Sequence, residues 1–377
     1  SRTFLPLRTL YSLCMPPFNK CRKCTYTKRI RHAHLKPANI HQNLKSHGIY
    51  YCILRQQAYD EASFNEKNSG YGFELRYYKG HLNLNNVILT QGVDAVCIFV
   101  NDTADAEVIR QLAANGVKLL ALRCAGYNNV DLKAAAENGI TVVRVPAYSP
   151  YAVAEYTVAY ALPQPEDTRA TWRTRDGNFS LHGLLGFDMY GKTAGIIGTG
   201  KIAKKLIAIL RGFGMNILAY DLYPDYNFAR EHQVVYTTLD ELYRSSDIIS
   251  LHCPLTEQTR YLINDYSISK MKDGVMIINT GRGQLIHTMP DEGLKNKKIG
   301  SAGLDVYEEE SEYFYEDRSD KIIDDDTLAR LLSFNNVIVT SHQAFFTREA
   351  LANIASTTLM NIKDFMEHKK LENEVRL

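Results

Sequence analysis

The feature that most constrains the fold is the stretch of residues 195–221, GIIGTGKIAKKLIAILRGFGMNILAYD. A short apolar run leads into Gly198 and Gly200, an amphipathic helical pattern follows, and a second apolar run ends at Asp221. Strand, glycine turn, helix, strand and acid, in this order, form the βαβ unit that binds dinucleotides. The stretch therefore predicts a doubly wound parallel α/β sheet of the Rossmann type.

The residue types in this stretch indicate which dinucleotide binds. Gly198 permits the tight turn, and Gly200 lets the backbone approach a pyrophosphate at the N-terminus of the helix. Asp221, 23 residues after Gly198, can accept hydrogen bonds from the adenosine ribose and would repel a 2′-phosphate. We therefore expect NAD rather than NADP, with Ala203 at the third position of the fingerprint.

Length and charge bound the class of protein. A chain of 377 residues that is 45% hydrophobic and 23% charged is long enough for two globular domains. The net charge of +2 is uneven, because residues 1–59 hold eleven Lys or Arg and no acid, which leaves the remainder at −9. No apolar stretch is long enough to cross a membrane, and a basic run alone does not indicate nucleic-acid binding. We expect neither a membrane nor a nucleic-acid partner.

Cysteine usage points to a reducing compartment. The seven cysteines form no disulfide framework in a chain of this size, and Cys97, Cys124 and Cys253 lie in apolar, strand-like runs. Cys21 and Cys24 have metal-ligand spacing, but no second pair completes a site, so no metal is expected. We therefore expect a cytoplasmic protein.

The first 46 residues form a basic segment without regular hydrophobic periodicity. Few apolar positions could offset the entropy of ordering it, about 1–2 kcal/mol per residue, so we expect a disordered, dispensable tail. The arginine-rich, acid-free composition leaves a mitochondrial or plastid address open as the alternative.

Alternating strand and helix patterns on either side of the glycine stretch predict two domains. Before it, strands over 49–54, 72–78, 95–100, 118–123 and 141–145 form a small parallel unit. After it, further apolar runs add up to a sheet of about six main strands, and the helical pattern 347–368 is long enough to return to the first unit. The predicted domains are therefore a tail over 1–46, a discontinuous flavodoxin-like substrate domain over 47–148 and 343–377, and a nucleotide domain over 149–342.

Three polar residues near predicted strand ends could carry chemistry: Arg282, Glu310 and His342. Reduction of a 2-keto acid needs a cation to grip the carboxylate and polarise the carbonyl, and the planar guanidinium suits both tasks. It also needs a proton donor that titrates near neutrality, as histidine does, and a carboxylate that orients the imidazole. The three residues meet these needs, although Glu310 lies in an acidic run that could equally be a solvated surface.

Nine stretches of the chain resemble the D-isomer-specific 2-hydroxyacid dehydrogenase family over about residues 48–374: AVCIFVND, LRCAGYNNVDL, VRVPAYSP, MYGKTAGIIGTGKI, SLHCPLT, GVMIINTGRG, AGLDVYEEE, YFYEDRS and VIVTSHQAFFTREAL. Among the members of the family, the last three stretches are most like those that interconvert pyruvate and D-lactate. The resemblance implies an NAD-dependent oxidoreductase of small 2-keto and 2-hydroxy acids.

Matching motifs carry the roles of the family to residues of this chain. The resemblance implies that Arg282 binds substrate, His342 donates the proton and Glu310 holds His342. It places Tyr148 in the substrate pocket and the backbone of Val100 and Asn101 at the substrate carboxylate. The implied cofactor contacts are Gly198, Gly200, Lys201, Ile202, Asp221, Cys253, Pro254, Thr259, Thr280, Gly281 and Asp305.

The chain also departs from the family pattern. Pro163 and Pro165 interrupt a helix that lies at the subunit contact of relatives, although a homodimer or higher homo-oligomer is still expected. The segment 287–290 is one residue shorter than its counterpart. Two alternatives stay open: a related dehydrogenase for larger keto acids, and an NAD-sensing binding protein like the corepressors that share this fold.

Overall fold

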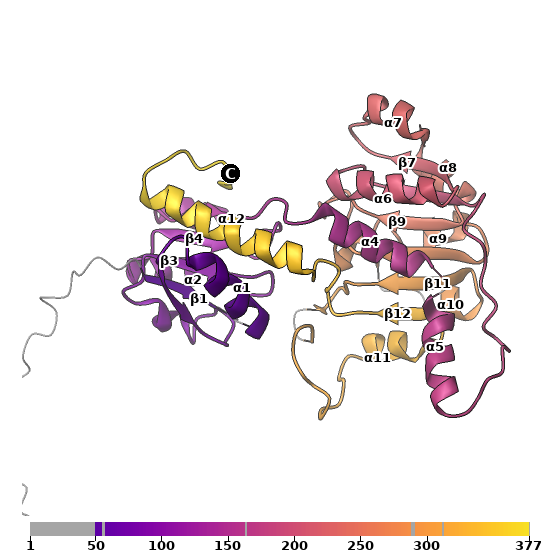
Figure 1. Cartoon of the computed structure of the whole chain (residues 1–377), viewed down its shortest axis with the longest axis horizontal. Coiled ribbons are helices and arrows are strands. Elements are labelled where there is room, and N and C mark those ends of the chain that lie inside the picture. Colours follow the sequence, from indigo (N-terminus) through magenta and orange to yellow (C-terminus); the bar gives the residue numbers. More distant parts are fainter. Residues whose placement is uncertain (1–49, 55–56, 163, 288–290, 311–312, 377) are drawn as a thin grey trace, which may run out of the picture. The chain divides into compact units, whose positions relative to one another are not determined.

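The computed structural model describes residues 50–376 except 55–56, 163, 288–290 and 311–312 (Figure 1). The predicted tail over residues 1–46 lies outside the described residues. The described part contains two sheets, one of five strands and one of seven, and every strand pair within them is parallel.

The five-stranded sheet is formed by the N-terminal part of the described chain. Its strands are β1 (Tyr50–Ile53), β2 (Glu74–Tyr77), β3 (Ala95–Ile98), β4 (Leu119–Leu122) and β5 (Thr141–Val143). The spatial order β2-β1-β3-β4-β5 is the flavodoxin-like order that was predicted. Strands β3 and β4 are buried at every position, as expected where helices cover both faces of a parallel sheet.

The helices of this sheet come from both ends of the described chain. They are α1 (Ala58–Asn68), the 3₁₀ turn η1 (Val87–Thr90), α2 (Ala106–Ala114), α3 (Leu132–Glu137) and the C-terminal α12 (Arg348–Met366). Helix α12 lies beside α1 and contacts β4 (Figure 1). The C-terminal helix therefore returns to the first sheet, in agreement with the predicted discontinuous domain.

The seven-stranded sheet contains the glycine stretch. Its strands are β6 (Thr193–Ile197), β7 (Asn216–Tyr220), β8 (Val234–Tyr236), β9 (Ile248–Leu251), β10 (Val275–Asn279), β11 (Ile299–Leu304) and β12 (Val337–Val339). Read from β8, the spatial order is 3-2-1-4-5-6 with β12 added at the far edge. The Rossmann arrangement is confirmed, and the sheet has seven strands rather than about six.

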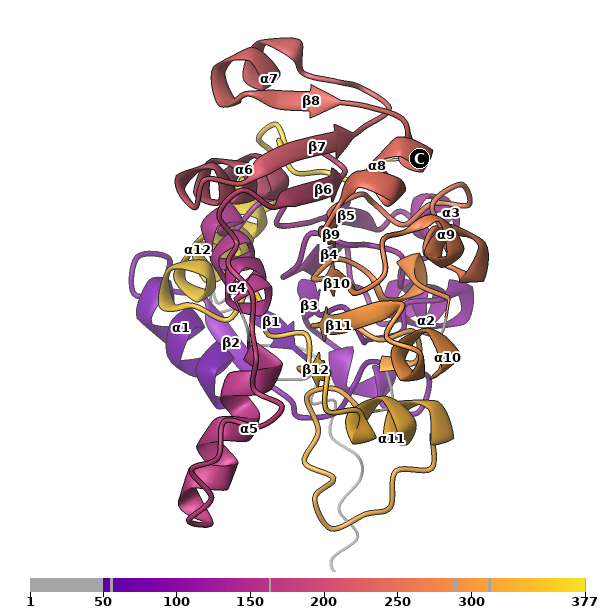
Figure 2. The same cartoon turned by 90° about the vertical axis from the view of Figure 1, so that its right-hand side faces the viewer.

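Two helices, α4 and α5, precede this sheet, and further short helices separate its strands (Figure 2). They are α4 (Pro150–Ala161), α5 (Gln164–Arg175), α6 (Lys201–Gly212), α7 (Tyr226–His232), α8 (Leu239–Ser245), α9 (Asp265–Lys270), η2 (Gly283–Leu285), α10 (Asp291–Lys295) and α11 (Asp326–Ser333). Helix α4 ends at Ala161 and α5 begins at Gln164, so the helix breaks where the prolines predicted it would.

Helix α6 fixes the glycine turn against the sheet. Its buried side chains are Ala203, Leu206, Ile207 and Leu210, and a fully buried leucine stabilises the fold by about 2 kcal/mol relative to an exposed one. Phe213 has the helical spacing of this face but is 40% exposed, because α6 ends at Gly212. Helix α4 packs along α6 (Figure 2).

Candidate active site

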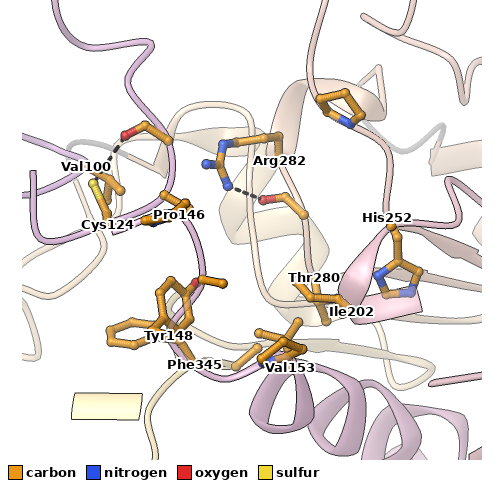
Figure 3. Close-up of a pocket in the computed structure, with 18 of the residues that line it drawn as sticks. Val100, Cys124, Pro146, Tyr148, Val153, Ile202, His252, Thr280, Arg282 and Phe345 are labelled. Carbon is orange, nitrogen blue, oxygen red and sulfur yellow. Dashed lines mark hydrogen bonds between the residues drawn. The ribbon is translucent and has the colours of Figure 1, made fainter. Parts of the chain in front are cut away.

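A cavity of about 710 Å³ lies at the carboxyl ends of strands from both sheets (Figure 3). Such a volume suits a bound small molecule, and strand carboxyl ends are where doubly wound sheets bind ligands. The predicted site residues that line it are Val100, Tyr148, Gly200, Lys201, Ile202, Cys253, Pro254, Thr280, Gly281, Arg282, Asp305 and His342. Predicted residues that do not line it are Asn101, Gly198, Asp221, Thr259 and Glu310.

The glycine turn has the geometry of a phosphate cradle. Gly198 has φ +89°, and a Cβ there would lie 2.6 Å from the amide nitrogen of Cys253, so no side chain fits. Gly200 is the N-cap of α6, and a Cβ there would meet no protein atom within 4 Å. The open space in front of Gly200, with the amides of Lys201 and Ile202 at the helix start, therefore fits a dinucleotide pyrophosphate.

Asp221 is held beside the glycine turn by the turn itself. Its Oδ2 accepts hydrogen bonds from the amide and hydroxyl of Thr199 at 2.6 and 2.9 Å, and its Oδ1 accepts one from the amide of Tyr223 at 2.8 Å. Partial burial opposes ionisation, but these hydrogen bonds hold the pKa of Asp221 below its usual range. A fixed carboxylate at the end of β7 suits ribose binding and would repel a 2′-phosphate.

Arg282 follows β10 in a loop shaped by backbone contacts (Figure 3). Buried Asn279 spans this loop, because its side chain accepts from the amide of Gly281 at 3.0 Å and donates to the carbonyl of Arg282 at 2.9 Å. A Cβ at Gly283 would lie 2.1 Å from the carbonyl oxygen of Tyr307. The loop therefore directs Arg282 into the cavity, where its Nη1 donates to the carbonyl of Gly281 at 2.8 Å.

His342, on the cavity wall, pairs with Glu310, which lies outside the cavity lining. Nδ1 of His342 lies 2.8 Å from Oε1 of Glu310, and the two side chains are 14% and 18% exposed. A carboxylate only accepts hydrogen bonds, so the contact assigns a ring proton to Nδ1 and leaves Nε2 as the nitrogen that can exchange a proton with a substrate. Glu310 also accepts from the amide of Tyr307 at 3.1 Å, which fixes the carboxylate behind the imidazole.

Asp305 holds the loop that carries His342. Its Oδ1 accepts from the Thr340 hydroxyl at 2.6 Å and the Gln343 amide at 2.8 Å, and its Oδ2 accepts from the Ala344 amide at 2.8 Å. Burial raises the pKa of Asp305 against the effect of these hydrogen bonds. Asp305 was predicted as a cofactor contact, and the structure places it on the cavity wall with both carboxylate oxygens engaged by its own protein.

The other predicted substrate residues lie in different settings. Tyr148 lines the cavity with its ring edge toward Phe345, the two ring centroids being 5.9 Å apart, and burial raises the pKa of Tyr148 to about 12 (Figure 3). Val100 lines the cavity too. Asn101 does not, and its side-chain nitrogen is buried without a partner among the described residues.

The loop that carries the predicted cofactor contacts Cys253, Pro254 and Thr259 is held by its own hydrogen bonds. Thr259 donates from its hydroxyl to the carbonyl of Pro254 at 2.7 Å, so it supports the loop and does not line the cavity. Thr280 does line the cavity, and its hydroxyl oxygen lies 3.1 Å from that of Thr157. Cys253 lies beside the glycine turn, and burial raises the pKa of its thiol to about 11, so it is a neutral wall of the cavity.

Three residues at the site were missed by the sequence reasoning. Gly126 faces Arg282 so closely that a Cβ would lie 2.3 Å from its Nη2. His252 follows β9 at the cavity edge, 2.8 Å from the hydroxyl of Ser250, and burial lowers its pKa to about 4. Tyr315, within the stretch YFYEDRS, donates to the carbonyl of His342 at 2.8 Å. Each of the three lies in a stretch that carries the family resemblance, LRCAGYNNVDL, SLHCPLT and YFYEDRS, but no pattern within these stretches singles the residue out.

The described residues contain no cluster of three or more metal-ligating side chains and no helix long and apolar enough to cross a membrane.

Known proteins with similar sequences and structures fall in one family. The family model described as "D-isomer specific 2-hydroxyacid dehydrogenase, NAD binding domain" matches residues 167–344. A 2-hydroxyacid dehydrogenase homolog of Haemophilus influenzae is 51% identical and D-lactate dehydrogenase of Escherichia coli is 50% identical, each match covering 86% of this chain and 98% of the relative. A solved structure of the pyruvate reductase of Chlamydomonas reinhardtii aligns with TM-score 0.81 at 42% identity, covering 86% of this chain and 98% of that one.

These matches extend over both sheets, and the glycine turn lies within the matched NAD-binding domain. The chain therefore belongs to the D-isomer-specific 2-hydroxyacid dehydrogenase family and is an NAD-dependent oxidoreductase.

Proposed function

We propose that this protein is an NAD-dependent D-lactate dehydrogenase that catalyses pyruvate + NADH + H⁺ ⇌ D-lactate + NAD⁺. The observation that carries the proposal is the His342–Glu310 pair, which lies at the same cavity as Arg282 and the glycine turn. The names of the Escherichia coli and Chlamydomonas reinhardtii relatives support pyruvate as the keto acid. In the reducing direction the reaction regenerates NAD, as a fermenting cell requires.

The side chains of this chain divide the chemistry among them. Bound NADH supplies the hydride. Arg282 binds the substrate carboxylate with its guanidinium fork and polarises the carbonyl. His342, as imidazolium, gives its Nε2 proton to the carbonyl oxygen as negative charge develops there, and Glu310 stabilises the charged ring. Removal of water from the cavity strengthens each of these interactions.

The walls of the cavity support a small substrate. Tyr148, Val153 and Phe345 line the cavity, and they lie together in the lower part of the close-up, away from Arg282 (Figure 3). Steady-state rates on pyruvate, 2-ketoisocaproate and phenylpyruvate test the assignment. We expect the highest kcat/KM for pyruvate, and a clear preference for either larger acid would reassign the protein to a related dehydrogenase. Tight NADH binding without turnover of any keto acid would indicate an NAD sensor.

We further propose that the protein forms a homodimer through residues 172–190. In the single chain this segment exposes large apolar side chains to solvent. Those of Trp172, Phe179, Leu181, Leu185 and Tyr190 are 63–93% exposed. Apolar patches of this kind mark interaction surfaces. Light scattering of the wild type should give twice the chain mass, and Leu185→Asp should lower it. A wild-type monomer would contradict this proposal and leave the enzymology unaffected.

A cytoplasmic location is proposed from cysteine usage. Cys52, Cys97, Cys124 and Cys253 are free thiols, and the first three are buried. Such a set fits a reducing compartment. A fluorescent fusion of the full chain tests it, and import into mitochondria or plastids would overturn it.

A further inference from the structure

The proton donor has an unusual backbone conformation. His342 has φ +51°, in the left-handed region that residues with a Cβ rarely adopt and that is strained unless the surroundings hold it. The Cα–Cβ direction depends on this backbone, so the conformation decides where the imidazole points. The groups that fix the backbone of His342 are therefore part of how the proton donor is aimed.

The amide and the carbonyl of His342 are hydrogen-bonded to different segments of the chain. On one side, the amide of His342 donates to the carbonyl of Asp305 at 2.7 Å, and the Asp305 carboxylate accepts from the next two amides. On the other side, the carbonyl of His342 accepts from the hydroxyl of Tyr315 at 2.8 Å. Tyr315 therefore holds the carbonyl group of His342, whereas Asp305 holds its amide group.

The ring of Tyr315 is itself fixed. It stacks on the imidazole of His342 at 6.3 Å between centroids and 29° between planes, and it meets Phe99 edge-on at 5.5 Å. Burial raises the pKa of Tyr315 well above its usual value, so the phenol remains protonated and can donate. Glu310 lies on the same chain segment, so this segment holds the His342 ring through Glu310 and its backbone through Tyr315.

We propose that Tyr315 is a positioning residue, whose hydroxyl holds the carbonyl of His342 and so keeps the imidazole aimed into the cavity. The proposal rests on His342 being the proton donor of the proposed function. It assigns a role in the reaction to the stretch 313–319, which does not itself line the cavity.

The test separates the hydroxyl from the ring. Tyr315→Phe keeps the aromatic ring and removes the hydroxyl that donates to His342. Tyr313→Phe is a matched control in the same segment, since the Tyr313 hydroxyl accepts from the amide of Asp325 at 3.0 Å, away from His342. Both variants are made in the full chain, and kcat and KM for pyruvate are measured beside the Kd for NADH and the thermal midpoint.

We expect Tyr315→Phe to lower kcat about 3- to 10-fold, the effect of one lost hydrogen bond, while KM and the NADH Kd stay within about twofold. Tyr313→Phe should leave kcat unchanged. A lowered thermal midpoint with wild-type kcat in Tyr315→Phe would make the tyrosine purely structural and overturn the proposal.

A double-mutant cycle shows whether Tyr315 acts through His342. In a His342→Gln background, Tyr315→Phe should cause no further loss of the residual rate. A loss as large as that in the wild-type background would overturn the inference while leaving the proposed function intact. If His342→Gln alone kept the wild-type rate, the proposed function would fail instead.

Discussion

Two regions at the cavity are built in different ways. One is the glycine turn, and the other is the cluster of His342, Glu310 and Asp305, which we call the His342 corner. The glycine turn is one continuous stretch, in which β6, α6 and β7 succeed each other and Asp221 bonds to Thr199 across the turn. The His342 corner joins three segments, and the pairs that define it are separated by 32 residues for Glu310 and 38 residues for the Asp305 contact with Gln343. The first is a local backbone structure, and the second is a long-range side-chain network.

This difference indicates what each region can tolerate. A glycine turn binds through backbone amides, so its function depends on which residues leave space for the ligand. The His342 corner depends on polar side chains that each bind defined partners, so the loss of one side chain leaves its partners unsatisfied. We therefore expect single substitutions at the corner to damage turnover, and those near the turn to alter cofactor selection or stability.

The largest effect is expected from His342→Gln. Without the proton donor, kcat for pyruvate should fall about 10²- to 10⁴-fold. Fluorescence titration should give an NADH Kd near that of the wild type, because the glycine turn is intact. A matching loss of NADH affinity would show that the two regions are not separable.

A smaller effect should follow from Gly126→Ala. The new methyl group would lie 2.3 Å from Nη2 of Arg282, so the guanidinium has to move away from its place in the cavity. We expect the KM for pyruvate to rise about 10- to 100-fold, as for a lost bidentate charge contact worth about 1.5–3 kcal/mol. Gly212→Ala is the control, because a Cβ there meets nothing within 4 Å. An unchanged KM in Gly126→Ala would show that Arg282 does not grip the substrate.

His252, beside the glycine turn, should make stability depend on pH. Burial lowers its pKa to about 4 from 6.5, so the unfolded chain binds the extra proton between these values. The free energy of unfolding should therefore fall as pH drops from 6.5 toward 4, by about 2 kcal/mol from this residue at pH 4.5.

Urea unfolding at pH 7 and pH 4.5 measures this contribution. Between the two pH values, the free energy of unfolding of His252→Gln should fall by about 2 kcal/mol less than that of the wild type. His287→Gln changes an exposed histidine and should match the wild type. Equal losses in all three proteins would contradict the predicted neutral state of His252.

The smallest effect is expected from Asp221→Ser. Removal of the carboxylate should lower the affinity for NADH about tenfold, because one charge-assisted contact is lost. It should also reduce the preference for NADH over NADPH. Asp273→Asn changes a carboxylate that is 89% exposed and should alter neither Kd. A preference for NADH that survives in Asp221→Ser would place selectivity elsewhere in the cofactor cleft.

The contrast between the regions also explains how far the sequence could be interpreted. The Rossmann sheet was predictable because its signals are local: a glycine turn, helical periodicity and an acid at a fixed spacing. The pairing of Glu310 with His342 needed the family resemblance, since spacing alone could not separate Glu310 from Glu308 and Glu309. Asp221 was assigned to the ribose without its bonds to Thr199, which no pattern indicates.

Long-range contacts were beyond the sequence. No sequence pattern indicates that the carboxylate of Asp305 binds the loop of His342. Its contact with the cofactor stays a prediction. The apolar run 337–340 does predict β12, although the expected sheet had only about six main strands. The close approach of Gly126 to Arg282 likewise joins residues far apart in the chain.

The close approach at Gly283 limits which positions can be substituted to change the keto acid specificity of this enzyme. A Cβ at this position would lie 2.1 Å from the carbonyl oxygen of Tyr307, so only glycine lets the arginine loop approach the segment between β11 and Glu310 this closely. A mutant library aimed at new keto acids would be wasted on positions 281–283. Diversity belongs at Tyr148, Val153 and Phe345, whose side chains form the cavity wall without fixing the backbone of Arg282.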